Sequence, residues 1–295
     1  MKPYFRLLRP QQWSKNLLVF AALLFAQRYF YIEDWVCSVS IFIAFSLVAS
    51  GNYIINDLLD VQLDRLHPRK SKRPIAAGEI GFGSAISLAV CLFIVGLLIG
   101  WSLNLLTFAI LLGYVIIMLL YSIRLKQVML LDVFIIALGL TSRAIIGGTA
   151  IEVSISSWLQ VCTFFVALMF AMAKRRQELS RVGEELEKGR KSLRGAPPLL
   201  VWDLWIIMVS AITILSYTLY TTDAKTIEHV GSNGLLYSVP FVVFAILRYQ
   251  VAVYVNDKGE DPTETLLRDR WILLSVLGWI LTVIIVLTHI LDPYR

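Results

Sequence analysis

Cysteine, histidine and charged side chains are scarce in this chain. Its 295 residues include three cysteines and three histidines, and only 16% are Asp, Glu, Lys or Arg. The cysteines, Cys37, Cys91 and Cys162, fall in separate apolar stretches, without the paired spacing of a disulfide framework or a zinc site. We therefore expect neither kind of site and interpret the three as small hydrophobic residues.

Long polar stretches are missing as well. The longest, residues 174–200, is too short to bury a core of its own, which argues against a separate soluble domain. The net charge of +6 is not gathered into a nucleic-acid-binding module, so we expect no nucleic-acid partner. The sequence predicts one domain over residues 1–295 and leaves the oligomeric state open.

Apolar runs make up most of the chain. Hydrophobic residues account for 58% of it and the mean hydropathy is +0.72, which is typical of a protein embedded in the lipid bilayer. Stretches long enough to cross about 30 Å of hydrocarbon predict an all-α fold with nine transmembrane helices. We expect them over residues 14–32, 36–57, 83–101, 104–122, 131–150, 156–176, 202–221, 234–254 and 271–291.

The basic residues are distributed unevenly between the two sides that these helices define. Of the 27 Lys and Arg residues, 23 lie before or at the start of the first helix, or in the last two turns of the second, fourth, sixth and eighth helices and the loops after them. Because cytoplasmic loops carry the excess of positive charge, these segments are expected to face the cytoplasm. The sequence therefore predicts a multi-pass protein of the cytoplasmic (inner) membrane with a cytoplasmic N-terminus.

Three carboxylates stand at the end of the second apolar run, where charge is otherwise avoided. On a helix, the spacing of Asp57, Asp60 and Asp64 places all three on one face, with Asn52 and Asn56 on the adjoining stripe. Such close like charges repel one another unless a cation lies between them. Oxygen ligands of this kind suit Mg²⁺, which usually shares its shell with substrate phosphates. This face predicts a magnesium-diphosphate site.

A basic loop follows directly. His67-Pro68 is expected to end the helix, because proline cannot extend it and restrains the preceding residue. The run that includes Arg69, Lys70 and Lys72-Arg73-Pro74 then lies beside the acidic face, where cations next to a bound metal are explained by phosphate. The alternative is that these residues only mark a cytoplasmic loop.

The motif Asn56-Asp57-x-x-Asp60-x-x-x-Asp64, followed by Arg65-x-His67-Pro68 and Arg73-Pro74-Ile75-x-x-Gly78, resembles the first aspartate-rich motif of the UbiA superfamily of intramembrane prenyltransferases. The resemblance extends over essentially the whole chain. It implies nine helices around a cytoplasm-facing cavity, with Mg²⁺ bound by Asp57, Asp60, Asp64 and Asn56.

One departure from that family's pattern bears on the substrate. Where a second aspartate-rich motif is usual, this chain has the basic sequence Ala173-Lys174-Arg175-Arg176-Gln177-Glu178-Leu179. Together with Arg9-Pro10-Gln-Gln-Trp13-x-Lys15-Asn16, Tyr121-Ser-x-x-Leu125-Lys126 and Gly259-Glu-Asp261-Pro262-Thr-Glu264, it resembles the decaprenyl-phosphate phosphoribosyltransferase branch. That resemblance implies transfer of 5-phosphoribose from phosphoribosyl diphosphate (PRPP) to a polyprenyl phosphate, with release of diphosphate.

The expected active site combines these segments. We predict that Asp57, Asp60 and Asp64 are the catalytic carboxylates. Substrate contacts are predicted for Asn52, Asn56, Lys15, Arg73, Tyr121, Lys126, Arg143, Lys174, Arg175 and Glu178.

Arg143 is singled out because an arginine inside an apolar helix usually faces a cavity or a partner. It shares a helix face with Asp132, about 16 Å deeper at 1.5 Å per residue. A structural ion pair with Asp132, or contact with an asparagine of the second helix, is the alternative.

Two other functions are weighed. Prenyl transfer from a polyprenyl diphosphate to an aromatic or glycerol-phosphate acceptor would need a second acidic cluster, and residues 174–181 contain none. A secondary transporter would place its charged groups near the bilayer midplane, on broken helices in repeated halves. The acids of this chain instead lie at a helix end.

Overall fold

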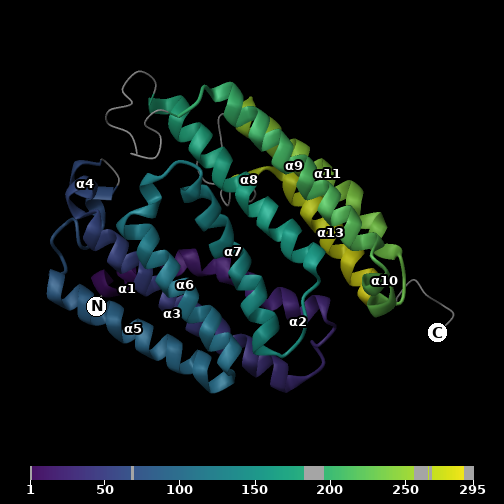
Figure 1. Cartoon of the computed structure of the whole chain (residues 1–295), viewed down its shortest axis with the longest axis horizontal. Coiled ribbons are helices and arrows are strands. Elements are labelled where there is room, and N and C mark those ends of the chain that lie inside the picture. The colour runs from purple at the N-terminus through teal and green to yellow at the C-terminus, as the bar shows by residue number, and fades with distance from the viewer. Residues whose placement is uncertain (1, 68–69, 183–195, 256–264, 266–267, 289–295) are drawn as a thin grey trace. The chain divides into compact units, whose positions relative to one another are not determined.

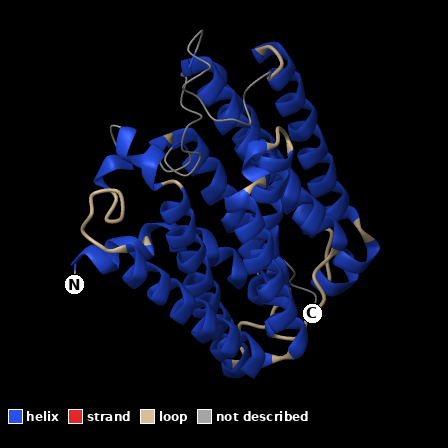
Figure 2. Cartoon of the chain, turned by 60° about the vertical axis from the view of Figure 1, so that its left-hand side comes forward, coloured by secondary structure: helices blue, strands red, loops and turns tan. Residues whose placement is uncertain are grey.

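The computed structural model describes residues 2–67, 70–182, 196–255, 265 and 268–288, and every regular element in these ranges is helical (Figure 2). The prediction of an all-α fold is confirmed. The chain forms two compact units, Met1–Ile135 with Gly139–Ile155, and Ile136–Leu138 with Ser156–Arg295. The prediction of a single domain stays a prediction. The quoted motif at residues 259–264 lies outside the described residues, as do Pro68 and Arg69.

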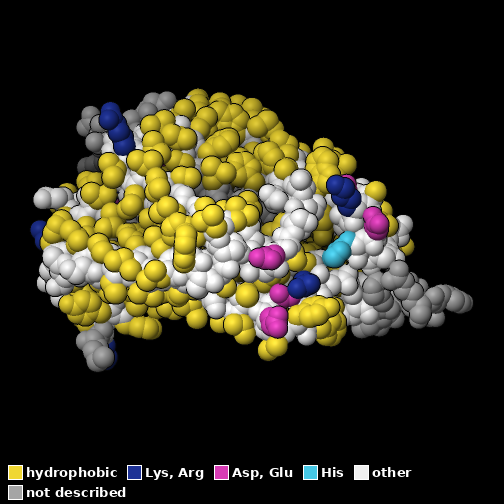
Figure 3. All heavy atoms as spheres, turned by 60° about the horizontal axis from the view of Figure 1, so that its bottom comes forward, with side chains coloured by type: hydrophobic (Ala, Val, Ile, Leu, Met, Phe, Trp, Pro, Cys, Tyr) yellow, Lys and Arg dark blue, Asp and Glu magenta, His cyan; other side chains and the backbone are white. Residues whose placement is uncertain are grey.

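Eight helices in the described part are long and apolar enough to cross a membrane. Hydrophobic side chains dominate the face of the molecule seen in Figure 3, and many leucines, among them Leu98, Leu204 and Leu281, are more than half exposed. So many large apolar side chains exposed along helices of this length are expected where lipid, and not water, surrounds the protein. The chain is therefore a multi-pass membrane protein, as predicted.

The spans of the first unit are α3 (Ile32–Leu59), α5 (Phe82–Leu103), α6 (Leu105–Ile123) and α7 (Leu131–Ala150). Helices α5 and α6 pack against α3 (Figure 1), and the short α1 (Lys2–Leu8) lies against it as well. Their common core contains the fully buried side chains of Phe45, Leu111 and Ile146. Helix α3 is thus the centre of this unit, and it carries the acidic motif at its C-terminal end.

The predicted span over residues 14–32 is the one that differs, so the described ranges contain eight such helices where nine were expected. Its place is taken by a 3₁₀ helix, η1 (Pro10–Phe20), followed by a short α-helix, α2 (Ala21–Phe25). A hydropathy criterion misjudges this segment, because composition does not distinguish a 3₁₀ helix from an α-helix and does not show that the polar Asn16 is buried.

Hydrogen bonds show that this segment runs antiparallel to α3. Trp13 Nε1 donates to Ser50 Oγ at 3.1 Å, and Asn16 Nδ2 donates to Ser46 Oγ at 2.9 Å. Further on, Arg28 pairs with Asp34 near the start of α3. The segment therefore follows most of the length of α3 in a conformation that rises about 2.0 Å per residue instead of 1.5 Å.

Helix α7 holds this segment closely. A Cβ atom added to Gly147 would lie 2.0 Å from the carbonyl oxygen of Val19, a distance that no side chain tolerates. Glycine at this position therefore allows the backbone of η1 to reach the surface of α7.

The second unit contains α8 (Ser157–Val182), α9 (Leu199–Thr222), α10 (Ala224–Val230), η6 (Gly234–Ser238), α11 (Val239–Tyr254) and α13 (Arg270–Leu287). Helix α8 packs on α9, and α11 packs on α13. Buried polar groups join them, since Gln250 Nε2 donates to Ser210 Oγ at 3.0 Å and Trp279 Nε1 donates to the hydroxyl of Tyr217 at 2.7 Å. Asp269 caps α13 by accepting hydrogen bonds from the backbone of Trp271 and Ile272.

Candidate active site

The three aspartates do not share one uninterrupted helix. Asp57 lies in the last turn of α3, Asp64 on α4 (Val61–Leu66), and Asp60 at the junction, with φ −95° and ψ 4°. The expectation of a single helix face is therefore corrected. The junction stays close to helical, because Asp60 N donates to Asn56 O and Asp64 N donates to Asp60 O. Helix α4 ends at Leu66, with His67 extended, as expected before a proline.

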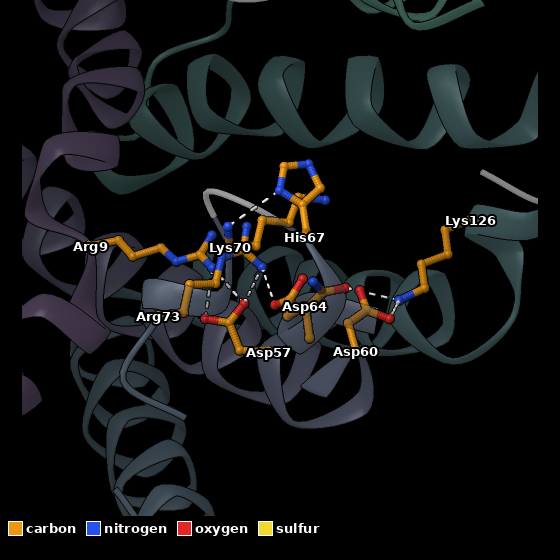
Figure 4. A network of polar contacts seen from close by, with 9 residues as sticks. Arg9, Asp57, Asp60, Asp64, His67, Lys70, Arg73 and Lys126 are labelled. Atoms are coloured by element: carbon orange, nitrogen blue, oxygen red, sulfur yellow. Dashed lines mark hydrogen bonds and ion pairs between the residues drawn. The ribbon is translucent and has the colours of Figure 1, made fainter. Parts of the chain in front are cut away.

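Two arginines neutralise the buried pair of aspartates (Figure 4). Asp57 and Asp64 are only 2% and 3% exposed. Arg9 binds both carboxylate oxygens of Asp57 at 2.5 and 2.7 Å, and Arg73 bridges the two acids at 2.9 Å from Asp57 and 2.5 Å from Asp64. The cation that the repulsion between these acids requires is thus supplied by arginine side chains.

A lysine forms an ion pair with the third aspartate, Asp60. Lys126, on η3 (Leu125–Gln127) after α6, places its Nζ 2.6 Å from Asp60 and 3.2 Å from the amide oxygen of Asn56. Asp60 is more open than the other two aspartates, with 23% of its side chain exposed. The structure therefore brings together six of the predicted site residues: the three aspartates, Asn56, Lys126 and Arg73.

The turn after Arg73 holds that arginine in place. Ala77 N donates to the carbonyl of Arg73 at 2.8 Å, and Glu79 N donates to the carbonyl of Pro74 at 2.9 Å. Gly78 closes this turn at φ +76°, a conformation that other residues adopt only with strain. The neighbouring Ile75 is buried in the core under α3, which anchors the turn. The motif Arg73-Pro74-Ile75-x-x-Gly78 thus fixes the position of the Arg73 guanidinium beside the aspartates.

Arg9 was missed as a site residue, although its motif was noted. It joins α1 to η1 in the left-handed conformation, φ 53° and ψ 57°, which a residue with a side chain adopts only at a cost. Its guanidinium also lies over the ring of Tyr53, 5.2 Å from the centroid. The sequence signal that could have identified Arg9 is a cation directly before a proline, at the start of an apolar segment. The predicted Lys15, by contrast, is exposed on η1.

The donor atoms of this cluster fit Mg²⁺ by their chemistry, because carboxylate and amide oxygens are the ligands it prefers. Their arrangement, however, is not that of a metal site. Among the described residues, no three Asp, Glu, His or Cys side chains are placed to hold a metal ion. Arg73 instead occupies the space between Asp57 and Asp64. Binding of Mg²⁺ by Asp57, Asp60, Asp64 and Asn56 stays a prediction, and it requires Arg73 to move.

Arg143 lies deeper in the first unit, 5% exposed on α7. Its Nε donates to Asn16 Oδ1 at 2.7 Å, another nitrogen donates to the carbonyl of Gly139, and the guanidinium lies 4.7 Å from the ring centroid of Phe45. The sequence pointed to Asp132 or an asparagine of the second helix, whereas this amide comes from η1. Substrate contact by Arg143 stays a prediction.

Two further predicted residues are buried in the same unit. Tyr121, in the last turn of α6, is 7% exposed. Asn52, on α3, is 3% exposed, and neither atom of its amide has a hydrogen-bond partner in the described part of the chain.

The remaining predicted contacts belong to the second unit, at the C-terminal end of α8. Arg175 is 2% exposed and donates to Glu178 at 2.6 Å, while Lys174 is exposed. Beside them, Arg176 binds Asp203 of α9 at 2.8 Å and lies over the ring of Tyr254. Glu178 thus orients Arg175. Contact of these side chains with substrate stays a prediction.

Known proteins resemble the chain over nearly its full length. Residues 17–273 match the UbiA prenyltransferase family. A decaprenyl-phosphate phosphoribosyltransferase from Mycolicibacterium smegmatis is 36% identical over 288 residues, covering 93% of this chain and 89% of that protein. The enzyme of the same name from Mycobacterium tuberculosis is 34% identical over 282 residues, covering 94% and 91%.

A solved structure shares the fold. A UbiA homolog from Archaeoglobus fulgidus, bound to GPP and Mg²⁺, superposes with a TM-score of 0.71 over 97% of this chain and 99% of that one. Its sequence is 23% identical, so this likeness bears on the fold alone.

Proposed function

Because the chain belongs to the UbiA prenyltransferase family, we propose that it transfers 5-phosphoribose from PRPP to a polyprenyl phosphate of the decaprenyl type and releases diphosphate. The observation that carries this proposal is the charge of the two predicted motifs, one in each unit. Asp57, Asp60 and Asp64 are each paired with a cation, and α8 carries Lys174-Arg175-Arg176 where the family resemblance predicts more acids. Such a protein suits two phosphorylated substrates better than one prenyl diphosphate.

In the proposed reaction, the bond between C1 of the ribose and the diphosphate breaks, and a phosphate oxygen of the lipid bonds to C1. The lipid phosphate is already an anion, so no side chain has to remove a proton from it. Catalysis then consists of positioning and electrostatic stabilisation of the leaving group. This accounts for a site made of ion pairs, without the arrangement of a nucleophile and a base.

The cations of the site have two partners in this scheme. In the ligand-free protein, Arg9, Arg73 and Lys126 bind the aspartates. The aspartates and Asn56 would hold Mg²⁺ when the donor binds, and the metal would supply positive charge that stabilises the departing diphosphate. The guanidinium of Arg73 and the ammonium of Lys126 are then free to donate to phosphate oxygens. In this exchange the aspartates would keep a cation beside them, and Arg73 and Lys126 would keep an anion beside them.

The location follows from the distribution of positive charge. We propose that the N-terminus and the acidic end of α3 face the cytoplasm of the inner membrane, since 23 of 27 basic residues lie in or near the N-terminal segment and the alternate loops on that side. PRPP would then arrive from the cytoplasm and the polyprenyl phosphate from the bilayer.

Prenyl transfer from a polyprenyl diphosphate is the second candidate, since the family takes its name from it. The basic stretch on α8 argues against it, because a second set of carboxylates would be needed to bind more Mg²⁺ around the donor. Relatives named for phosphoribosyl transfer cover more than 90% of this chain, which favours the first candidate.

The test uses membranes that contain the full chain, labelled PRPP, polyprenyl phosphate and Mg²⁺. We expect a lipid-linked phosphoribose that disappears when the metal is chelated. Parallel reactions replace PRPP with a labelled polyprenyl diphosphate and an aromatic or glycerol-phosphate acceptor. Product in the second reaction and none in the first would overturn the proposal.

A further inference from the structure

We propose that the side-chain amide of Asn52 hydrogen-bonds a ribose hydroxyl of the donor and thereby selects a sugar diphosphate over a prenyl diphosphate. This inference rests on the proposed function. It concerns a single side chain of α3, and it assigns the donor preference to that position.

Asn52 is a buried polar group without a partner. Its side chain is 3% exposed, and within the described residues neither Oδ1 nor Nδ2 makes a hydrogen bond. The other buried amide of this unit shows the contrast, because Asn16 uses Nδ2 toward Ser46 and Oδ1 toward Arg143. A buried amide that is left unpaired destabilises a fold, so its partner is either an ordered water or a ligand, and the position of Asn52 beside the acidic cluster favours a ligand.

The position of Asn52 places it next to the acidic cluster. Phe45, Ala49, Asn52, Asn56 and Asp60 follow steps of three or four residues and therefore lie along one stripe of α3. At one end of this stripe, Lys126 contacts Asn56 and Asp60; at the other, Arg143 covers Phe45. Asn52 lies between them, about 6 Å along the helix axis from Asn56 at 1.5 Å per residue.

That separation matches the size of the donor. With the diphosphate held at the end of α3, the ribose attached to it would lie one turn further back along α3, beside Asn52. An amide both donates and accepts hydrogen bonds, as a hydroxyl does, so a ribose hydroxyl can satisfy it. A prenyl chain carries no hydroxyl and would leave both amide atoms unpaired.

The expected size of the effect follows from that difference. A site that hydrogen-bonds a substrate hydroxyl rejects the analogue that lacks it far more strongly than a site of matching shape alone, by up to about 10⁴-fold. The donor is also held by its diphosphate contacts, so the single amide contributes only part of the recognition. We therefore expect about a 100-fold loss of kcat/KM when either the Asn52 amide or the ribose hydroxyl is removed.

The experiment compares Asn52→Leu with the natural chain and with Ser38→Ala. Ser38 is a matched control, because it is also buried on α3 without a partner for its hydroxyl in the described part, about 21 Å from Asn52 along the helix. Each protein is assayed with PRPP and with its analogues lacking the 2-hydroxyl or the 3-hydroxyl of the ribose.

The natural chain and Ser38→Ala should prefer PRPP to at least one analogue by about 100-fold, and Asn52→Leu should lose that preference by accepting PRPP poorly. If Asn52→Leu discriminates among the three donors as the natural chain does, the inference is wrong.

A binding measurement separates this inference from the proposed function. Thermal unfolding is followed with Mg²⁺ and either PRPP or diphosphate. Diphosphate should stabilise the natural chain and Asn52→Leu alike, whereas the extra stabilisation by PRPP should be absent in the variant. This readout needs no turnover, so a chain that makes no lipid-linked product would refute the proposed function and leave the donor contact to be judged by binding.

The stability of the ligand-free protein tests whether the Asn52 amide has a structural role instead. Removing an unpaired buried amide should leave the melting temperature of Asn52→Leu unchanged or raised. A melting temperature well below that of the natural chain in both Asn52→Leu and the smaller Asn52→Ala would show that the amide supports the fold, and would overturn the inference.

Discussion

Arg143 on α7 donates a hydrogen bond from its Nε to Oδ1 of Asn16 on η1, over 2.7 Å and across 127 residues of sequence. Asn16 in turn donates to Ser46 on α3. The pair therefore joins the irregular N-terminal segment to two membrane-spanning helices at once. Arg9 at the start of the same segment reaches Asp57, so the pair also determines where that guanidinium lies.

The first prediction concerns this pair. Arg143→Met leaves the amide oxygen of Asn16 unpaired and should destabilise the protein by about 1–3 kcal/mol, seen as a lower melting temperature in detergent. Arg124→Met changes an exposed arginine of the same unit and should have almost no effect. Equal effects of the two substitutions would show that the buried contact contributes nothing.

The second prediction concerns the metal. Asp57→Asn with Asp60→Asn should abolish Mg²⁺-dependent transfer, by at least about 10²–10³-fold, because both anionic ligands are lost. The control is Asp34→Asn, which changes a buried aspartate at the other end of α3, paired with Arg28. Transfer by that control should stay within about twofold of the natural rate, since it is remote from the site. An active double variant would refute the metal site.

The third prediction follows from the bridge formed by Arg73. Because its guanidinium lies between Asp57 and Asp64, it competes with a divalent cation for both carboxylates. Arg73→Gln should therefore bind Mg²⁺ more tightly without substrate, measured by thermal shift across a Mg²⁺ titration, and yet have a higher KM for PRPP.

Lys72→Gln is the matched control, because it removes a neighbouring exposed positive charge. It should alter neither quantity beyond a small electrostatic effect. A Mg²⁺ affinity that is the same in Arg73→Gln and in the natural chain would contradict the competition.

The fourth prediction tests the packing of η1 against α7. Gly147→Ala would place a methyl group on the carbonyl of Val19, and the resulting displacement should cost about 1–3 kcal/mol. Gly113→Ala on α6 meets no atom within 4 Å and should be neutral or stabilising by up to about 1 kcal/mol. Thermal unfolding of both variants gives the comparison, and a stable Gly147→Ala protein would exclude the close contact.

Much of the fold could be predicted because lipid imposes a simple rule. An apolar run of about 20 residues has to be helical, since no water is present to pair with its backbone. The segment at residues 10–25 escaped this rule, because composition does not distinguish a 3₁₀ helix from an α-helix. What decides its conformation is tertiary contact with Ser46, Arg143 and Gly147.

The site could be predicted in part, for a similar reason. The aspartates were found because their spacing is local, within one segment. Arg9 was missed because its contact with Asp57 joins residues 48 positions apart, and the left-handed backbone that directs it is not encoded by a glycine. That the buried amide of Asn52 has no hydrogen-bond partner in the described part of the chain is likewise a result of packing, which no sequence pattern shows.

The six charged side chains, Arg9, Asp57, Asp60, Asp64, Arg73 and Lys126, sum to zero. A resting enzyme with this balance presents no electrostatic barrier to an anionic headgroup that diffuses toward it in the leaflet, and none to a phosphorylated donor that arrives from the water. The charge of the resting site therefore does not itself impose which of the two anionic substrates has to arrive first.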